Sequence, residues 1–262
     1  MSPLTIKDVD FGKTSKDYAA HRAGFPESFF TRLAEAGWMK AAKDVLDIGT
    51  GTGTLARGFA RRGFTVTGLD ASDNQITAAK ELDAEAGIHV EYIVSAAEKT
   101  PLPDQSFDII TAGQCWHWLD TAVVVTELQR LLRPNGKIII AYFDWIHEEG
   151  NPVDVMAKLR EKYNPGWKGE FPLGFYPQGP GQLSLGSFNA TDSFMYRENI
   201  PYTHEGWRGR MRAYAGIGGS LPPAQVHAFD VEFTPILKQA FPEAVMQVPH
   251  KIWAEVFELP AL

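Results

Sequence analysis

Three glycines at alternating positions form the stretch of this sequence with the clearest chemical meaning. Gly49, Gly51 and Gly53 directly follow an apolar run at 44–48 that is typical of a buried parallel strand. A glycine turn between a strand and a helix lets the backbone approach a nucleotide closely, because no side chain stands in the way. The next strand-like run ends at Asp70, where an acid can accept both hydroxyls of a ribose. The pattern therefore predicts a site for a nucleotide cofactor.

A second set of reactive side chains lies in the segment Gln114–Trp118, which follows a strand-like run at 107–112. His117 is a candidate general base for a hydroxyl or amine nucleophile. The alternative is a histidine that only positions its loop or donates one hydrogen bond. The aromatic faces of Trp116 and Trp118 suit a cationic ligand, although either tryptophan could instead belong to the core.

Three arginines are candidates for binding an anionic acceptor. Arg208 and Arg212 lie four residues apart, so they share one face of the helix expected at 205–214. Together with Arg22 they could hold a planar carboxylate through paired hydrogen bonds. The alternative is that these arginines pair with acidic neighbours such as Glu205.

Alternating strand and helix patterns must position these groups. The expected helices are 53–62, 73–86 and 121–132, and the expected strands are 44–49, 64–69, 89–94, 107–112 and 137–143, with a turn at 133–136. This alternation over about 100 residues predicts a doubly wound parallel sheet with right-handed crossovers. Ligands bind at the carboxyl ends of such strands, so the glycine turn, Asp70 and the segment 114–118 should surround one crevice.

The rest of the chain completes the expected architecture. Residues 1–40 form N-terminal helices that cover the site, and 41–143 form the Rossmann-like core. The Pro- and Gly-rich, aromatic stretch within 144–192 reads as an inserted cap, and residues 193–262 complete the sheet and its helices. We expect an α/β fold with a seven-stranded sheet whose last strand is reversed.

Composition narrows the class of protein. The chain has 262 residues and a net charge of −7, which argues against a nucleic-acid partner. The single cysteine, Cys115, excludes an internal disulfide and fits a reducing, cytoplasmic compartment, where we expect it to be a buried structural thiol. We expect no membrane span, no signal peptide and no metal site, because no apolar run is long enough and the histidines are scattered.

An ordered set of motifs resembles the class I S-adenosylmethionine-dependent methyltransferases. Within that class the chain looks like the small-molecule group that includes trans-aconitate methyltransferase-like proteins. The matching residues run in the expected order from 18 to 136: Tyr18-x-x-x-Arg22, Asp47-Ile-Gly49-x-Gly51-x-Gly53, Gly68-Leu69-Asp70, Ala97-Glu98-x-x-Pro101-Leu102-Pro103-x-x-Ser106-Phe107-Asp108, His117-Trp118-x-Asp120 and Leu132-Arg133-Pro134-x-Gly136.

The resemblance implies S-adenosyl-L-methionine as the cofactor. The Asp47 motif with its three glycines would lie under the methionine part, Asp70 would bind the ribose, and Ala97 and Glu98 would lie near the adenine. Ala96 stands where the family usually carries an aspartate for the adenine amine. The adenine would then be held by backbone groups, by Glu98 or by water.

The residues themselves, together with this resemblance, suggest further contacts and a reaction. Tyr18, Arg22 and Gln114 are candidate cofactor contacts, with Tyr18 and the tryptophans facing the sulfonium. A small organic acceptor would attack the methyl carbon in line, and most of the rate would come from positioning the two reactants. Tyr176 is a candidate for holding the flat body of the acceptor.

Two other functions fit part of the sequence. Gly51-x-Gly53-x-x-Ala56 also matches the dinucleotide fingerprint, which would make the protein an NAD-dependent Rossmann oxidoreductase. The other possible function is that of a non-catalytic S-adenosylmethionine-binding protein.

Overall fold

A computed structural model describes residues 23–167 and 185–260 of the chain. Tyr18, Arg22 and Tyr176 lie outside the described residues, so their expected roles stay predictions. The chain divides into two compact units, and each is described by itself. One comprises Ala23–Phe143, Gln178–Tyr196 and Ile252–Leu262, and the other comprises Met1–Arg22, Asp144–Pro177 and Arg197–Lys251.

Four parallel strands form the part of the sheet that carries the glycine turn. They are β1 (Asp44–Ile48), β2 (Thr65–Asp70), β3 (Glu91–Val94) and β4 (Phe107–Gly113). Strand β1 pairs with both β2 and β4, and β2 pairs with β3, so β1 lies inside the sheet. Strands β1 and β4 are buried along nearly their whole length, which explains their continuous apolar sequence.

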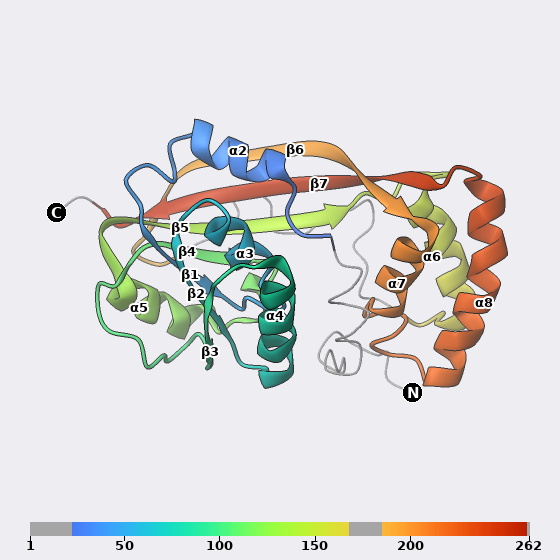
Figure 1. The fold of residues 1–262 in the computed structure, drawn as a ribbon, viewed down its shortest axis with the longest axis horizontal. Coiled ribbons are helices and arrows are strands. Elements are labelled where there is room, and N and C mark those ends of the chain that lie inside the picture. The colour runs from blue at the N-terminus through green and yellow to red at the C-terminus, as the bar shows by residue number, and fades with distance from the viewer. Residues whose placement is uncertain (1–22, 168–184, 261–262) are drawn as a thin grey trace. The chain divides into compact units, whose positions relative to one another are not determined.

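Three long strands complete the sheet: β5 (Leu132–Trp145), β6 (Asn189–Thr203) and β7 (Val245–Glu258). The strands of the described chain follow the order β3-β2-β1-β4-β5-β7-β6, and Figure 1 shows β7 between β5 and β6. Along β5, Tyr142 stacks on Trp253 and the Ile146 N–H donates to the Pro249 carbonyl oxygen. Partner numbers fall as β5 numbers rise, so β7 is antiparallel to β5. The predicted seven-stranded sheet with a reversed last strand is confirmed.

The helices largely follow the sequence patterns. The first unit holds α2 (Glu27–Glu35), α3 (Thr54–Ala60), α4 (Asp73–Ala86) and α5 (Thr121–Leu131), and the second holds α6 (Pro152–Tyr163), α7 (His204–Arg212) and α8 (Pro223–Ala240). Helix α4 has the predicted bounds: Ser72 occupies the N-cap position without a side-chain capping hydrogen bond, and Gly87 ends the helix in the left-handed conformation. Helix α6 lies inside the stretch expected to be a cap and was not predicted.

Strand β5 begins earlier than its sequence indicates. The turn expected at 133–136 lies within the strand, which starts at Leu132. The pairing register with β4 shifts between Phe107 and Ile109, and Asn135 has a φ of 64°. A left-handed residue distorts the local pleat, so this segment keeps turn-like backbone although it continues the ladder.

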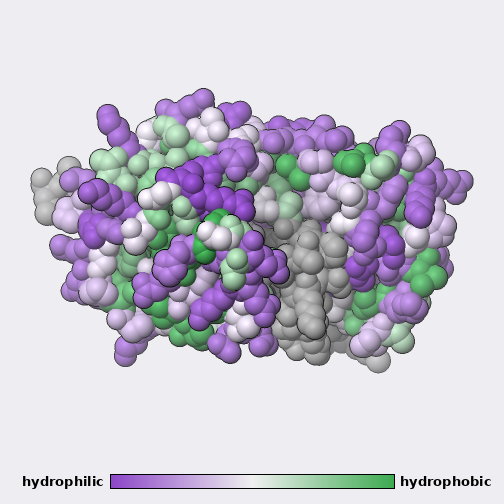
Figure 2. Space-filling view, in the orientation of Figure 1, coloured by the Kyte–Doolittle hydropathy of each residue, from purple (hydrophilic) through white to green (hydrophobic). Residues whose placement is uncertain are grey.

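Helices α2 and α3 pack closely in the first unit. The Phe30 ring of α2 meets the Phe59 ring edge-on at 5.5 Å between centroids. Over the face drawn in Figure 2, exposed residues are mainly hydrophilic, and the apolar residues there are scattered. Within the described ranges no helix is both long enough and apolar enough to cross a membrane.

Gly58 lies inside α3, where alanine would ordinarily favour the helix by about 1 kcal/mol. A β-carbon there would overlap the buried Phe30 ring, and overpacking costs about 1–3 kcal/mol. We therefore expect Gly58→Ala to lower the free energy of unfolding in a urea titration. Phe30→Leu shortens the obstructing side chain. In that background, Gly58→Ala should lower the free energy of unfolding by less than it does in the wild type. An increase in stability for Gly58→Ala would contradict this packing.

Candidate functional site

Asp47 is a buried carboxylate on β1, next to the glycine turn, and only 2% of its surface is exposed. The Thr50 hydroxyl donates to its Oδ2 at 2.6 Å, and the Thr111 hydroxyl donates to its Oδ1 at 2.7 Å. Burial raises the pKa of Asp47 to about 6, and the charge of Asp70 adds to the rise, while the two hydroxyls oppose it. A cationic ligand at this edge would stabilise the anionic form.

Asp70 connects the glycine turn to the end of β2. The Gly51 N–H donates to Asp70 Oδ2 at 2.9 Å, and the Ser72 N–H donates to Asp70 Oδ1 at 2.9 Å. Each carboxylate oxygen has a second lone pair, so both can also accept ribose hydroxyls. The acid is thus fixed in place by backbone groups before any ligand binds.

The three glycines of the turn all have positive φ angles, and their missing side chains face different surroundings. A β-carbon at Gly49 would lie 2.7 Å from Cys115 Cβ, and one at Gly53 would overlap the Tyr92 hydroxyl. Among the residues that the structure describes, a β-carbon at Gly51 would meet no atom within 4 Å. Gly49 and Gly53 are therefore required by protein packing as well as by backbone conformation. Gly51 is the glycine whose open side a ligand can approach.

Tyr92 supports the glycine turn from behind, and the sequence patterns did not single it out. Arg57, in helix α3, donates to the Thr52 carbonyl oxygen of the turn at 2.9 Å and to Asp83 at 2.6 Å. Burial raises the pKa of Tyr92 well above its ordinary range, and the neighbouring Asp83 adds to the rise. The phenol therefore stays neutral, and its bulk fixes the path of the turn.

The segment after β4 contains the predicted His-Trp pair. Gln114 has a φ of 58°, and its side-chain amide donates to the Phe143 carbonyl oxygen. Trp116–Trp118 form a short 3-10 helix in which Trp116 is 2% exposed and Trp118 is 43% exposed. The buried Cys115 thiol donates to the Ile48 carbonyl oxygen at 3.1 Å, which ties this segment to the end of β1.

Tyr142 orients His117, a contact that the sequence did not reveal. Nδ1 of His117 lies 3.0 Å from the Tyr142 hydroxyl oxygen. Tyr142 is fully buried on β5, and its ring stacks on Trp253 of β7 with centroids 4.9 Å apart. The contact orients the imidazole ring, and the Tyr142 hydroxyl can either donate to Nδ1 or accept from it.

Ala97 and Glu98 follow β3, beside Asp70. The Ser95 N–H donates to the Asp70 carbonyl oxygen at 3.0 Å, so the segment starts next to the acid expected to bind ribose. Ala97 is buried, and Glu98 Oε1 accepts the Asp120 N–H at 3.0 Å. The structure thus brings the predicted adenine segment to the same strand edge as the glycine turn.

Arg208 and Arg212 belong to the other unit, on α7. Arg208 binds Asp230 of α8 with two nitrogens, at 2.9 and 2.5 Å. Arg212 pairs with Glu205 at 2.7 Å and with Asp230 at 3.3 Å. This arrangement matches the alternative in which the arginines pair with acidic neighbours. In the part of the chain that the structure describes, no group of three or more potential metal-binding side chains occurs.

Comparisons with known proteins agree with this geometry. Residues 46–140 match a methyltransferase domain family. An uncharacterized methyltransferase of Mycobacterium tuberculosis is 29% identical over 168 residues, which cover 59% of this chain and 66% of that protein. A ubiquinone biosynthesis O-methyltransferase of Pseudomonas entomophila is 32% identical over 150 residues, covering 52% of this chain and 64% of the relative. The matched regions thus span less than two thirds of these curated relatives.

The fold has a solved counterpart. The structure of a candidate type II methyltransferase from Anaeromyxobacter dehalogenans superposes with a TM-score of 0.62 at 20% identity, covering 90% of this chain and 96% of that one. At this identity the likeness supports the class I fold, while the activity has to be argued from the site.

Because of Asp47, we expect the free energy of unfolding to fall as the pH rises. Its folded pKa of about 6 lies above its ordinary 3.8, so ionisation costs stability as the pH rises from about 4 to 6. We expect the wild type to lose about 1 kcal/mol relative to Asp47→Asn between pH 5 and pH 7. Urea titrations at both pH values measure this difference, and Asp73→Asn, which removes an exposed acid nearby, is the control. A difference independent of pH would contradict the buried, ionising carboxylate.

Proposed function

We propose, from the match of residues 46–140 to a methyltransferase domain family, that the chain moves a methyl group from S-adenosylmethionine to a small organic acceptor. The observation that supports it most strongly is the edge formed by the open side of Gly51 and the Asp70 carboxylate. The family implies S-adenosyl-L-methionine as the cofactor.

The residues at this edge fit that cofactor. Asp70 has lone pairs for the ribose hydroxyls, and Gly51 leaves room for close approach of the ligand. Asp47 and Asp70 make the edge anionic, which suits a ligand that carries an ammonium and a sulfonium group. Ala97 and Glu98 are the proposed adenine contacts, and Tyr18, Arg22 and Gln114 are proposed to complete the site.

Bound S-adenosylmethionine supplies an electrophilic methyl carbon, and the protein contributes positioning. Trp116 and Trp118 are proposed to limit the acceptor side of the site, where aromatic faces stabilise cationic charge. His117, held through Nδ1 by Tyr142, is proposed to accept the proton of the nucleophile at its other ring nitrogen. Once the nucleophile is aligned with the methyl carbon, the reaction needs little further catalytic help from the protein, since much of the rate of such displacements comes from orientation.

The acceptor itself is a separate proposal. It stays a prediction that the acceptor carries an acidic or strongly polar planar group. The predicted contacts are Arg22, Arg208 and Arg212, with Tyr176 against the flat face of the acceptor. Two acids already balance the charges of Arg208 and Arg212, which weakens their attraction for an anion. The cap at 144–192 and the N-terminal residues 1–40 are proposed to cover the reacting groups and exclude water.

Cofactor choice tests the proposal against the oxidoreductase alternative. We expect S-adenosylhomocysteine to bind far more tightly than NAD in calorimetry. Asp70→Ala should weaken that binding by tenfold or more, since a hydrogen bond to a charged group contributes about 1.5–3 kcal/mol. The matched control is Asp73→Asn, which removes a nearby acid that does not contact the turn. Tighter binding of NAD, or unchanged affinity in Asp70→Ala, would overturn the assignment.

Turnover tests the chemical roles and the non-catalytic alternative. With a panel of small acceptors and a labelled methyl donor, His117→Ala should reduce the rate much more than it reduces cofactor affinity. Tyr142→Phe should lower the rate partially, while Tyr163→Phe, which removes a hydrogen-bonded phenol elsewhere, should not. A wild-type rate in His117→Ala would leave His117 a structural residue.

A further inference from the structure

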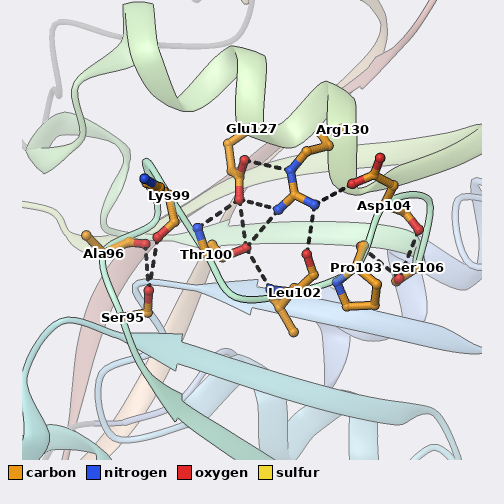
Figure 3. A network of polar contacts seen from close by, with 10 residues as sticks. All are labelled: Ser95, Ala96, Lys99, Thr100, Leu102, Pro103, Asp104, Ser106, Glu127 and Arg130. Carbon is orange, nitrogen blue, oxygen red and sulfur yellow. Dashed lines mark hydrogen bonds and ion pairs between the residues drawn. The ribbon is translucent and has the colours of Figure 1, made fainter.

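The segment from Ser95 to Ser106 has no regular secondary structure, yet it is fastened along helix α5 at several points (Figure 3). It leaves β3 beside Asp70, where Val94 and Asp70 are register partners, and it returns to β4 at Phe107. A loop of this length would ordinarily be mobile, because each ordered residue loses conformational entropy. The contacts with α5 are therefore what holds it.

Glu127, on α5, binds the middle of the segment. Its Oε1 accepts the Thr100 N–H at 2.8 Å and the Thr100 hydroxyl at 2.7 Å. Arg130 donates to both carboxylate oxygens, at 2.9 and 2.6 Å. These charged hydrogen bonds from Arg130 hold the pKa of Glu127 down to about 2, so the carboxylate is ionised at neutral pH.

Arg130 extends the same connection toward β4. One of its nitrogens donates to the Leu102 carbonyl oxygen at 2.7 Å and to Asp104 Oδ1 at 2.6 Å. Figure 3 shows the guanidinium between the carboxylates of Glu127 and Asp104, with the loop backbone passing beneath it. Glu127 and Arg130 together, here called the loop clamp, thus bind backbone or side-chain groups of three loop residues.

The first part of the segment is also tied to α5. Glu98 accepts the Asp120 N–H, and the Asp120 side chain accepts the Val123 N–H in the first turn of that helix. Within the segment, the Ser95 hydroxyl is 3.2 Å from the Lys99 carbonyl oxygen. Residues 95–99 therefore occupy a fixed position between Asp70 and the N-terminus of α5.

We propose that Glu127 and Arg130 are positioning residues for the cofactor, which set its affinity and its selectivity for adenine by holding residues 100–104 and, through them, the adjoining residues 95–99 beside Asp70. The inference rests on the proposed function, since it names what holds one side of the same site. In this role neither side chain needs to touch the ligand. The base of a bound nucleoside lies next to its ribose, so the segment that leaves β3 beside the ribose acid is the protein surface that meets the base.

A nearby ion pair separates this role from simple stabilisation. Arg133 pairs with Asp44 at 2.6 Å and with Asp108 at 3.0 Å. Asp44 starts β1 and Asp108 lies at the start of β4, so this pair sits at the amino-terminal edge of the sheet, away from the glycine turn. Arg133 and Arg130 are similarly exposed and each contacts two acids. Arg133→Gln is therefore a matched control for Arg130→Gln.

The experiment measures binding of S-adenosylhomocysteine and of S-inosylhomocysteine, which lacks the adenine amine, by calorimetry. In Arg130→Gln we expect affinity for S-adenosylhomocysteine to fall about tenfold, because binding must then order the loop. The preference for adenine over hypoxanthine should shrink, and amide exchange in 95–104 should accelerate. Arg133→Gln should keep the wild-type affinity and preference, even where its unfolding free energy drops as much.

Equal effects of the two variants on affinity, or an unchanged adenine preference in Arg130→Gln, would overturn the clamp as a positioning device. Thr100→Val, which removes the hydroxyl that contacts Glu127, Arg130 and the Leu102 N–H, gives the same test should Arg130→Gln fail to fold. If the wild type binds no S-adenosylhomocysteine, the proposed function fails. Amide exchange in 95–104 then reports separately whether the clamp orders the segment.

Discussion

The Asp70 carboxylate holds the candidate site together, because it accepts backbone N–H groups from Gly51 and from Ser72. One bond fixes the glycine turn after β1, and the other fixes the start of α4 after β2. The Asp70 carbonyl oxygen adds a third connection, to Ser95 after β3. Three neighbouring strand ends are thereby joined through one residue, so the edge is organised before a ligand binds.

This organisation concentrates negative charge where a cation is expected. Asp47 is buried behind the turn, and its charge is opposed by that of Asp70, which raises the pKa of Asp47 further. Without a ligand, the hydrogen bonds from two threonine hydroxyls and from the Ala56 backbone compensate only part of this cost. A ligand with positive groups relieves it, whereas the pyrophosphate of a dinucleotide would add to it. The electrostatics therefore favour S-adenosylmethionine over NAD for the same glycine pattern.

Local sequence signals predicted the parts of the fold and site that depend on neighbouring residues. The glycine turn, Asp70 and the bounds of α4 follow from residues close in sequence. Helix α6 also carries such a signal, since Asn151 caps it and Pro152 starts it, but the surrounding prolines and glycines obscured the pattern. The contacts of His117 with Tyr142 and of Gly53 with Tyr92 join distant segments, and no periodicity indicates them. The ion pairs of Arg208 and Arg212 with Asp230 were likewise set by tertiary packing.

The most direct test is a titration followed by the backbone amide signals of the glycine turn in two-dimensional NMR spectra. Addition of S-adenosylhomocysteine should shift the Gly51 and Ser72 amides, because both donate to the carboxylate that would bind the ribose. NAD should leave them unchanged at the same concentration. Unshifted Gly51 and Ser72 signals with saturating S-adenosylhomocysteine, or shifts produced by NAD at lower concentration, would contradict a methyltransferase cofactor at this edge.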